Sequence, residues 1–185
     1  MTILGDCAQT VDDVPRDVRV FLPKIFGRHL REIEMRRSYR NTLEIAEYAS
    51  KWNREDGIQY LERHGAEVIE VSCLTEGEAL QIICDHIEQE KQGYETIAIL
   101  TMTEGQAKRT YQYLKEKGNK VHYIDRNSSA FCKGITITTY YLAKGLEFDK
   151  VFVLGGEPEN PFYGQYQYIS ATRALHELEI YHIEA

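Results

Sequence analysis

The sequence has no long apolar run and no leader-like beginning. None of the apolar stretches in its 185 residues approaches the roughly 20 residues that span a bilayer. Residues 1–10 lack the basic start and the long apolar core of a signal peptide. We therefore expect no membrane partner and a cytoplasmic location.

Cysteine is scarce and dispersed. The 4 cysteines form no C-x-x-C pair and are Cys7, Cys73, Cys84 and Cys132. This spacing argues against a zinc site and against thioredoxin-like redox chemistry. We expect reduced, mostly buried thiols and no bound metal of the protein's own.

Positive charge is also in short supply, since the formal net charge is −7. Nucleic-acid affinity comes largely from neutralising phosphates, so a self-contained nucleic-acid-binding module is usually basic. The acidic balance argues against such a module. It remains compatible with one half of a composite groove.

What the sequence does contain is an alternation of short apolar runs with helical patterns, at 43% hydrophobic and 28% charged residues. We expect strands at 67–72, 96–100, 121–124, 135–139, 151–154 and 178–183, and helices at 41–53, 163–174 and after the capping pairs Thr75–Glu78 and Thr103–Gln106. This alternation predicts one α/β domain with a mainly parallel sheet. Ligands of such sheets usually bind at the carboxyl edge.

The N-terminal region gives weaker signals. Residues 2–4 are typical of the end of a strand, and 18–26 is an apolar segment in a loop marked by Pro15 and Pro23. A short strand is expected at 32–36, and Asn41 with Glu44 has the spacing of a capping box for the next helix.

Two segments near the start contain chemically useful side chains. Gly5-Asp6-Cys7-Ala8-Gln9 follows the first strand, and Gln9 can both donate and accept hydrogen bonds. Taken alone, this is an ordinary strand-end turn. Arginines surround Tyr39 at 36–41, which suits a phosphate and a stacked ring, although a solvated basic patch explains the same residues.

Two later segments are more specific. Residues 138–149 contain Lys-Gly-Leu-Glu-Phe-Asp between two predicted strands. There, Gly145 allows close backbone approach and Glu147 can accept from a ribose hydroxyl. Arg173 lies among small residues at 168–174, where it is either a presented guanidinium or a structural arginine paired with a carboxylate such as Glu177.

In order and context, the four segments resemble motifs III, IV, V and VI of UvrD/Rep/PcrA-type superfamily 1 helicases. The matches are Gly5–Gln9 to motif III, Ser38–Arg40 to motif IV, Thr139–Asp149 to motif V and Tyr168–Ala174 to motif VI. The resemblance spans nearly the whole chain and implies a RecA-like three-layer α/β/α fold. Residues 1–185 would form the second motor domain of an ATP-dependent DNA helicase or translocase.

The resemblance also implies a role for each matching residue. Gln9 would sense the γ-phosphate, Tyr39 would stack on adenine, and Arg40 and Arg173 would act as arginine fingers. Gly145 and Glu147 would contact the nucleotide, with Glu147 at the ribose. Thr139 would lie near the backbone of single-stranded DNA.

The phosphate-cradling string G-x-x-x-x-G-K-[ST] and the Asp-Glu pair expected upstream are absent from the chain. We therefore expect a fragment whose missing N-terminal RecA-like domain, in the same protein, is a partner and holds most of the ATP and Mg²⁺. The fragment alone is expected to be inactive, since two domains must close around the phosphates.

One departure from the family pattern is Tyr141, where the best-known members carry histidine. This region is closer to the HelD-like, or helicase IV-like, branch, which implies an alternative: an ATPase domain that remodels or recycles RNA polymerase. A third hypothesis is a non-catalytic interaction module, although Tyr39, Arg40, Glu147 and Arg173 are all intact.

Overall fold

The computed structural model describes residues 3, 5, 18–27, 31, 33–52, 57–89, 93–128 and 132–184. Their largest element is a six-stranded sheet in the order β3-β8-β7-β4-β6-β5. The strands are β3 (Ile69–Cys73), β8 (Ala174–Ile183), β7 (Phe148–Leu154), β4 (Thr96–Thr101), β6 (Gly134–Thr139) and β5 (Val121–Tyr123). Every pairing within it is parallel, which confirms the predicted α/β class.

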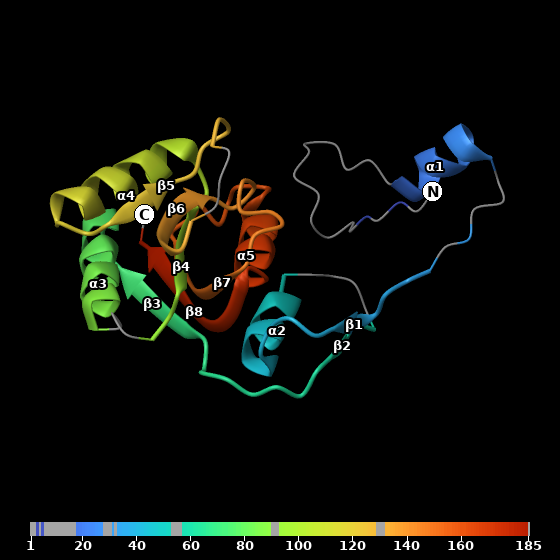
Figure 1. The fold of residues 1–185 in the computed structure, drawn as a ribbon, viewed down its shortest axis with the longest axis horizontal. Helices are drawn as coiled ribbons and strands as arrows, with labels where there is room; N and C mark the ends of the chain where they lie inside the picture. The colour runs from blue at the N-terminus through green and yellow to red at the C-terminus, as the bar shows by residue number, and fades with distance from the viewer. Residues whose placement is uncertain are drawn as a thin grey trace.

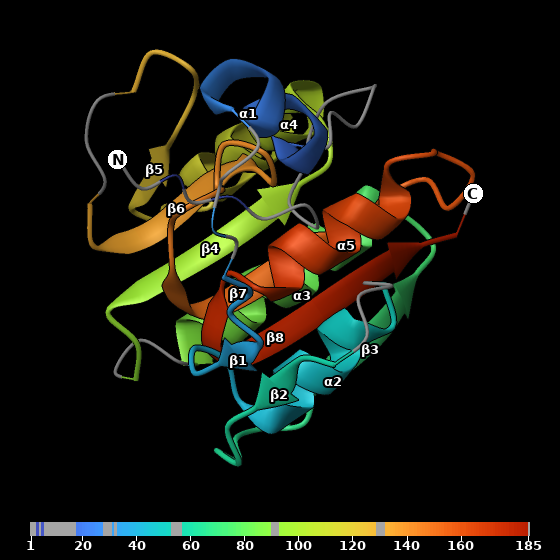
Figure 2. The same ribbon diagram turned by 90° about the vertical axis from the view of Figure 1, so that its right-hand side faces the viewer.

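Helices cover both faces of this sheet and complete a three-layer α/β/α arrangement (Figure 2). One face carries α3 (Glu76–Gln89) and α4 (Glu104–Glu116), and the other carries α2 (Leu43–Ser50) and α5 (Tyr163–Ala171). Along β7, Val151 and Val153 pack into the α2/α5 core, whereas Phe152 and Leu154 pack into the α3/α4 core. Burial on both faces explains why this strand is a continuous apolar run.

Two helix starts are capped as predicted. The Thr103 hydroxyl accepts from the backbone N–H of Gln106 at 3.2 Å and begins α4. The Thr75 hydroxyl accepts from the N–H of Glu78 at 3.1 Å, just before α3. Each bond satisfies a donor that the first helical turn leaves unpaired.

The predicted cap of α2 is wrong by one residue. Thr42, not Asn41, is the N-cap, and its hydroxyl accepts from the N–H of Ile45 at 3.5 Å. Asn41 instead sends its side-chain amide across the domain to carbonyls near the start of β8. A local capping pattern cannot reveal a partner that is more than a hundred residues away.

The N-terminal part also differs from the prediction. Residues expected in a loop form a helix, α1 (Val18–Phe26), with Pro23 inside it and Gly27 at a φ of 89° after it. Figure 1 shows α1 apart from the sheet and its covering helices. Its apolar residues recur at the helical spacing 18, 21, 22 and 25, and this signal outweighs the single hydrogen bond that proline removes.

A small parallel pair lies outside the main sheet. It joins β1 (Arg37–Ser38) to β2 (Gln59–Tyr60). The prediction of a strand at 32–36 is wrong, because residues 33–36 are in no strand and β1 begins only at Arg37. Within the described residues, no helix has both the length and the apolar character that crossing a bilayer requires.

Candidate functional site

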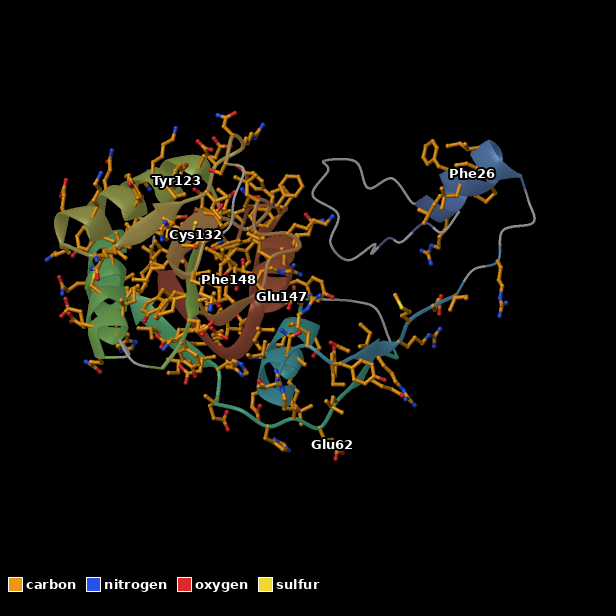
Figure 3. The ribbon with its side chains drawn as sticks, viewed as in Figure 1. Phe26, Glu62, Tyr123, Cys132, Glu147 and Phe148 are labelled. Carbon is orange, nitrogen blue, oxygen red and sulfur yellow. The ribbon has the colours of Figure 1, made fainter. Side chains whose placement is uncertain are left out.

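Most of the predicted site residues lie at the amino edge of the main sheet. Glu147 immediately precedes β7, and Arg173 immediately precedes β8. The backbone joins them, because the N–H of Phe148 donates to the carbonyl of Arg173 at 3.0 Å. Tyr39 and Arg40 lie in the segment between β1 and α2, and Figure 3 shows Glu147 beside that helix.

This position corrects the expectation that the ligand-binding residues gather at the carboxyl edge. Of the described site residues, Thr139 alone ends a strand there, level with Thr101 at the end of β4. About seven residues of strand separate that level from Glu147, which corresponds to roughly 20 Å. The predicted nucleotide and nucleic-acid residues therefore occupy opposite edges.

An ion pair joins the segment that resembles motif IV to the segment that resembles motif V. Nε of Arg40 lies 2.6 Å from Oε1 of Glu147, and the two side chains are 41% and 43% exposed. Tyr39, next to Arg40, is 61% exposed. A cation and a carboxylate are thus paired at the surface, and the residue before the cation carries an exposed aromatic ring.

Asn41 and Arg63 fix the segment that carries Arg40. The amide of Asn41 donates to the carbonyl of Ala174 at 2.5 Å and reaches that of Thr172 at 3.5 Å, on either side of Arg173. Nη2 of Arg63 donates to the carbonyl of Arg40 at 2.6 Å and to that of Leu175 at 2.6 Å. These bonds tie the two arginine-bearing segments into one unit.

Arg173 itself is 1% exposed and points into the domain. Its guanidinium donates to the carbonyls of Ile169 at 3.2 Å and Leu146 at 3.3 Å, and to the hydroxyl of Thr172 at 3.1 Å. In this conformation Arg173 has a structural role where the segment at 168–174 meets the segment at 139–149. A reach toward a nucleotide requires the guanidinium to leave these oxygens.

Gly145 has a backbone conformation that favours glycine. Its φ of +88° lies in the left-handed region, although a Cβ there would meet no atom within 4 Å. The turn therefore needs glycine for its conformation rather than for space. It directs the chain from the end of β6 back to Glu147.

Thr139 is 1% exposed, and its hydroxyl oxygen has no hydrogen-bond partner within the described part of the chain. The backbone carbonyl of Thr139 accepts from the N–H groups of Leu142 and Ala143. The side chain is therefore buried at the edge where a nucleic-acid contact was predicted.

A polar groove of about 450 Å³ adjoins the amino edge. Its walls include Arg63, His64, Tyr94, Asp149 and His176. Asp149, the last residue of the motif V match, accepts from the backbone N–H and hydroxyl of Thr96 at 2.8 and 2.9 Å. It therefore holds the starts of β4 and β7 together.

The structure does not test two predictions about the site, the role of Gln9 and the location of the Mg²⁺ ligands. Gln9 lies outside the described residues. In the described ranges, no three His, Cys, Asp or Glu side chains are grouped so as to hold a metal ion. The assignment of Mg²⁺ ligands to another domain stays a prediction.

Reasoning from the sequence missed Asn41 and Arg63 as parts of this site. The sequence pattern places Asn41 in a local cap, and Arg63 lies outside every motif match. No signal in the sequence pairs either residue with carbonyls at 172–175. Only the tertiary fold brings them together.

Comparison with solved structures relates the fold to known proteins, whereas no protein-family model and no curated protein matches the sequence. The C-terminal domain of a possible DNA helicase from Lactobacillus plantarum WCFS1 superposes with a TM-score of 0.65 at 23% identity, over 79% of this chain and 88% of that one. The PRRSV helicase gives 0.41 at 12% identity, over 81% and 23% of the two chains.

A complex of the arterivirus nonstructural protein 10 helicase with DNA gives 0.44 at 9% identity, over 76% of this chain and 30% of that one. The two viral likenesses are too weak to carry an argument. The likeness to the Lactobacillus domain concerns the fold, and together with the parallel three-layer architecture it shows that this chain has a RecA-like fold.

Proposed function

We propose that this chain is the second motor domain of an ATP-dependent superfamily 1 helicase or translocase, and that it completes an ATP site on a first motor domain. The observation that carries the proposal is the exposed ion pair of Arg40 and Glu147, 2.6 Å apart, with the exposed Tyr39 next to Arg40 in the chain. The RecA-like fold and the similarity to a helicase C-terminal domain support it.

The chemistry of these side chains fits the parts of ATP. The exposed Tyr39 ring suits an adenine, the Glu147 carboxylate can accept from ribose hydroxyls, and the Arg40 guanidinium can donate to phosphate oxygens. Arg40 and Glu147 neutralise each other in this structure. Nucleotide binding would separate them and give each its own partner.

Arg40 is the arginine that already reaches the surface, so we assign it the finger role in the closing cleft. A positive charge supplied from a second domain stabilises the charge that develops on the transferred phosphoryl group. Arg173 would join it only after leaving the carbonyls of Ile169 and Leu146. Mg²⁺, when bound with ATP, neutralises phosphate charge, and we assign its ligands to the first domain.

The direct test compares ATP turnover by the 185-residue chain with turnover by a protein that joins it to a first motor domain. The chain lacks a phosphate-binding loop, so alone it should not hydrolyse ATP. The two-domain protein should hydrolyse ATP faster when single-stranded DNA is added. Turnover by the chain alone that Arg40→Ala abolishes would contradict the proposal.

A second candidate, a HelD-like ATPase that acts on RNA polymerase, is favoured by Tyr141. This phenol, whose hydroxyl donates to Glu104 at 2.9 Å, stands where the better-known branch carries histidine. The same turnover assay separates the two candidates. Stimulation by RNA polymerase and indifference to single-stranded DNA would favour the HelD-like function.

A further inference from the structure

Three side chains from three different loops meet at the carboxyl edge, away from the surface that carries Arg40. Glu104 begins α4 after β4, Arg126 follows β5, and Tyr141 follows β6. These strands are neighbours in the order β4-β6-β5, so their ends lie side by side (Figure 2). We call these three residues the Glu104 cluster.

One carboxylate oxygen is the centre of the cluster. Oε1 of Glu104 accepts from Nε of Arg126 at 3.0 Å and from the hydroxyl of Tyr141 at 2.9 Å. The hydrogen bond from Tyr141, together with the charge of Arg126, outweighs desolvation and lowers the pKa of Glu104. Two donors from separate loops thus converge on one anionic oxygen.

A phosphate oxygen accepts the same two bonds. Arginine and tyrosine both donate to phosphates, and the arginine bond gains strength from its charge. The Arg126 side chain is 73% exposed, so a ligand from solvent can reach it. The converging donors therefore form a seat that an anion other than Glu104 can occupy.

The cluster also offers an aromatic surface. The Arg126 guanidinium lies 5.9 Å from the centre of the Tyr141 ring. Tyr141 in turn packs edge-to-face on the buried Tyr140, with ring centres 5.4 Å apart and an angle of 83°. An arginine beside a supported aromatic ring is the pairing that binds the phosphates and unstacked bases of single strands.

The position of the cluster agrees with this chemistry. Thr139, predicted to lie near a nucleic-acid backbone, ends β6 two residues before Tyr141. Duplex bases are stacked on each other and unavailable to a tyrosine ring, so the chemistry favours a single strand.

We propose that Arg126 and Tyr141 form a phosphate seat for single-stranded nucleic acid, and that Glu104 fills the seat until a phosphodiester displaces it. The inference rests on the proposed function and adds a specific contact and a competitor to it. Displacement breaks an ion pair between exposed side chains, which is a weak interaction. The phosphate restores equivalent bonds and brings a base to the Tyr141 ring.

The test measures binding of fluorescein-labelled oligothymidylate to the chain by fluorescence anisotropy across a range of salt concentrations. Glu104→Gln removes the competing charge and leaves the Thr103 cap, so it should tighten binding about threefold to tenfold. Arg126→Ala and Tyr141→Ala, made in the Glu104→Gln background, should each weaken binding about tenfold. Arg126→Ala should also reduce the slope of log K against log salt by about 0.7.

Matched controls come from an exposed ion pair at the opposite edge. Glu95 and Lys133 precede β4 and β6, and their side chains are 72% and 74% exposed. Glu95→Gln and Lys133→Ala change the net charge by the same amounts as Glu104→Gln and Arg126→Ala. Both controls should change binding less than about twofold.

The proposal is overturned if Glu104→Gln binds no tighter than Glu95→Gln, or if Arg126→Ala weakens binding no more than Lys133→Ala. It is equally overturned if neither the unmodified chain nor Glu104→Gln binds the oligonucleotide. Basal ATP turnover of the two-domain protein without nucleic acid, and its loss in Arg40→Ala, tests the proposed function separately. The two failures are therefore distinguishable.

Discussion

Arg40 and Arg173 have the same side chain but different surroundings. The Arg40 side chain is 41% exposed and pairs with a carboxylate that is itself exposed, whereas Arg173 is 1% exposed and donates to backbone oxygens. Loss of an exposed ion pair costs little. Removal of a buried guanidinium leaves acceptors unpaired and a cavity behind.

We expect Arg173→Ala to lower the free energy of unfolding by about 2 to 4 kcal/mol. Arg40→Ala should lower it by less than about 1 kcal/mol. Urea denaturation of the two variants beside the unmodified chain measures both values. Equal losses of unfolding free energy would contradict the stability difference that we infer from burial. In that case an activity assay on Arg173→Ala would be as easy to interpret as one on Arg40→Ala.

At the scale of elements, the segment before β3 is packed tightly on the start of α2. A Cβ added at Gly65 would lie 2.4 Å from Cγ2 and 3.0 Å from Cβ of the Thr42 cap. Arg63, two residues earlier, holds the carbonyls of Arg40 and Leu175. The contact at Gly65 therefore supports the segment that presents Arg40.

Gly65→Ala should destabilise the chain by about 1 to 3 kcal/mol through this overpacking. Gly77→Ala is the control, since a Cβ there meets only the Thr75 hydroxyl at 3.9 Å. Adding Thr42→Ser removes the nearest methyl group, keeps a capping hydroxyl and should recover part of the loss. Thermal unfolding of the three variants provides the measurement, and an equal loss in Gly77→Ala would refute the steric explanation.

Glu44 links α2 to the same segment through ionised hydrogen bonds. Its carboxylate accepts from His64 at 2.9 Å and from the N–H of Gly65 at 2.9 Å. These bonds, after that from its own backbone N–H, lower the pKa of Glu44 from 4.5 to about 2. Between these two pH values the unfolded chain therefore binds more protons than the folded chain. The contribution of Glu44 to the stability of the fold is present above pH 4.5 and is lost as the pH falls toward 2.

His64 changes stability in the opposite direction. Glu44 raises the pKa of His64 above 6.5. The contribution of His64 to the stability of the fold is therefore present below pH 6.5 and is lost as the pH rises through the pKa of the folded state. Urea midpoints measured from pH 2 to 8 should fall at both ends, and Glu44→Gln should flatten both slopes. Glu88→Gln, at an exposed position on α3, serves as the control. Equal flattening in both variants would rule out the Glu44 contacts as the cause.

At the scale of the whole molecule, the predictable features were those with local signals. The continuous apolar run at 151–154 predicted a strand buried on both faces, and Thr103 with Gln106 predicted the start of α4. Pro23 favoured a loop at 18–26, although α1 includes it. A single proline is a weaker signal than the apolar spacing around it.

The arrangement of the candidate site could be predicted only in part. The motif matches identified Arg40 and Glu147, which the fold pairs at the surface, and Tyr39, which is exposed. Three features depend on contacts distant in the sequence: the burial of Arg173, the bonds from Asn41 to residues 172 and 174, and the separation of Thr139 on the opposite edge. A motif match predicts the types of residues and their order along the chain, but it does not predict how exposed each side chain is.

The central claim is that Arg40 completes an ATP site shared with a first motor domain. The most direct measurement is steady-state ATP turnover, with single-stranded DNA, by the two-domain protein carrying Arg40→Ala or Arg36→Ala. Arg36 is an exposed arginine four residues away that pairs with Glu34 at 2.6 Å. We predict a loss of about a hundredfold or more for Arg40→Ala and near-normal turnover for Arg36→Ala. Undiminished turnover in Arg40→Ala would contradict the account.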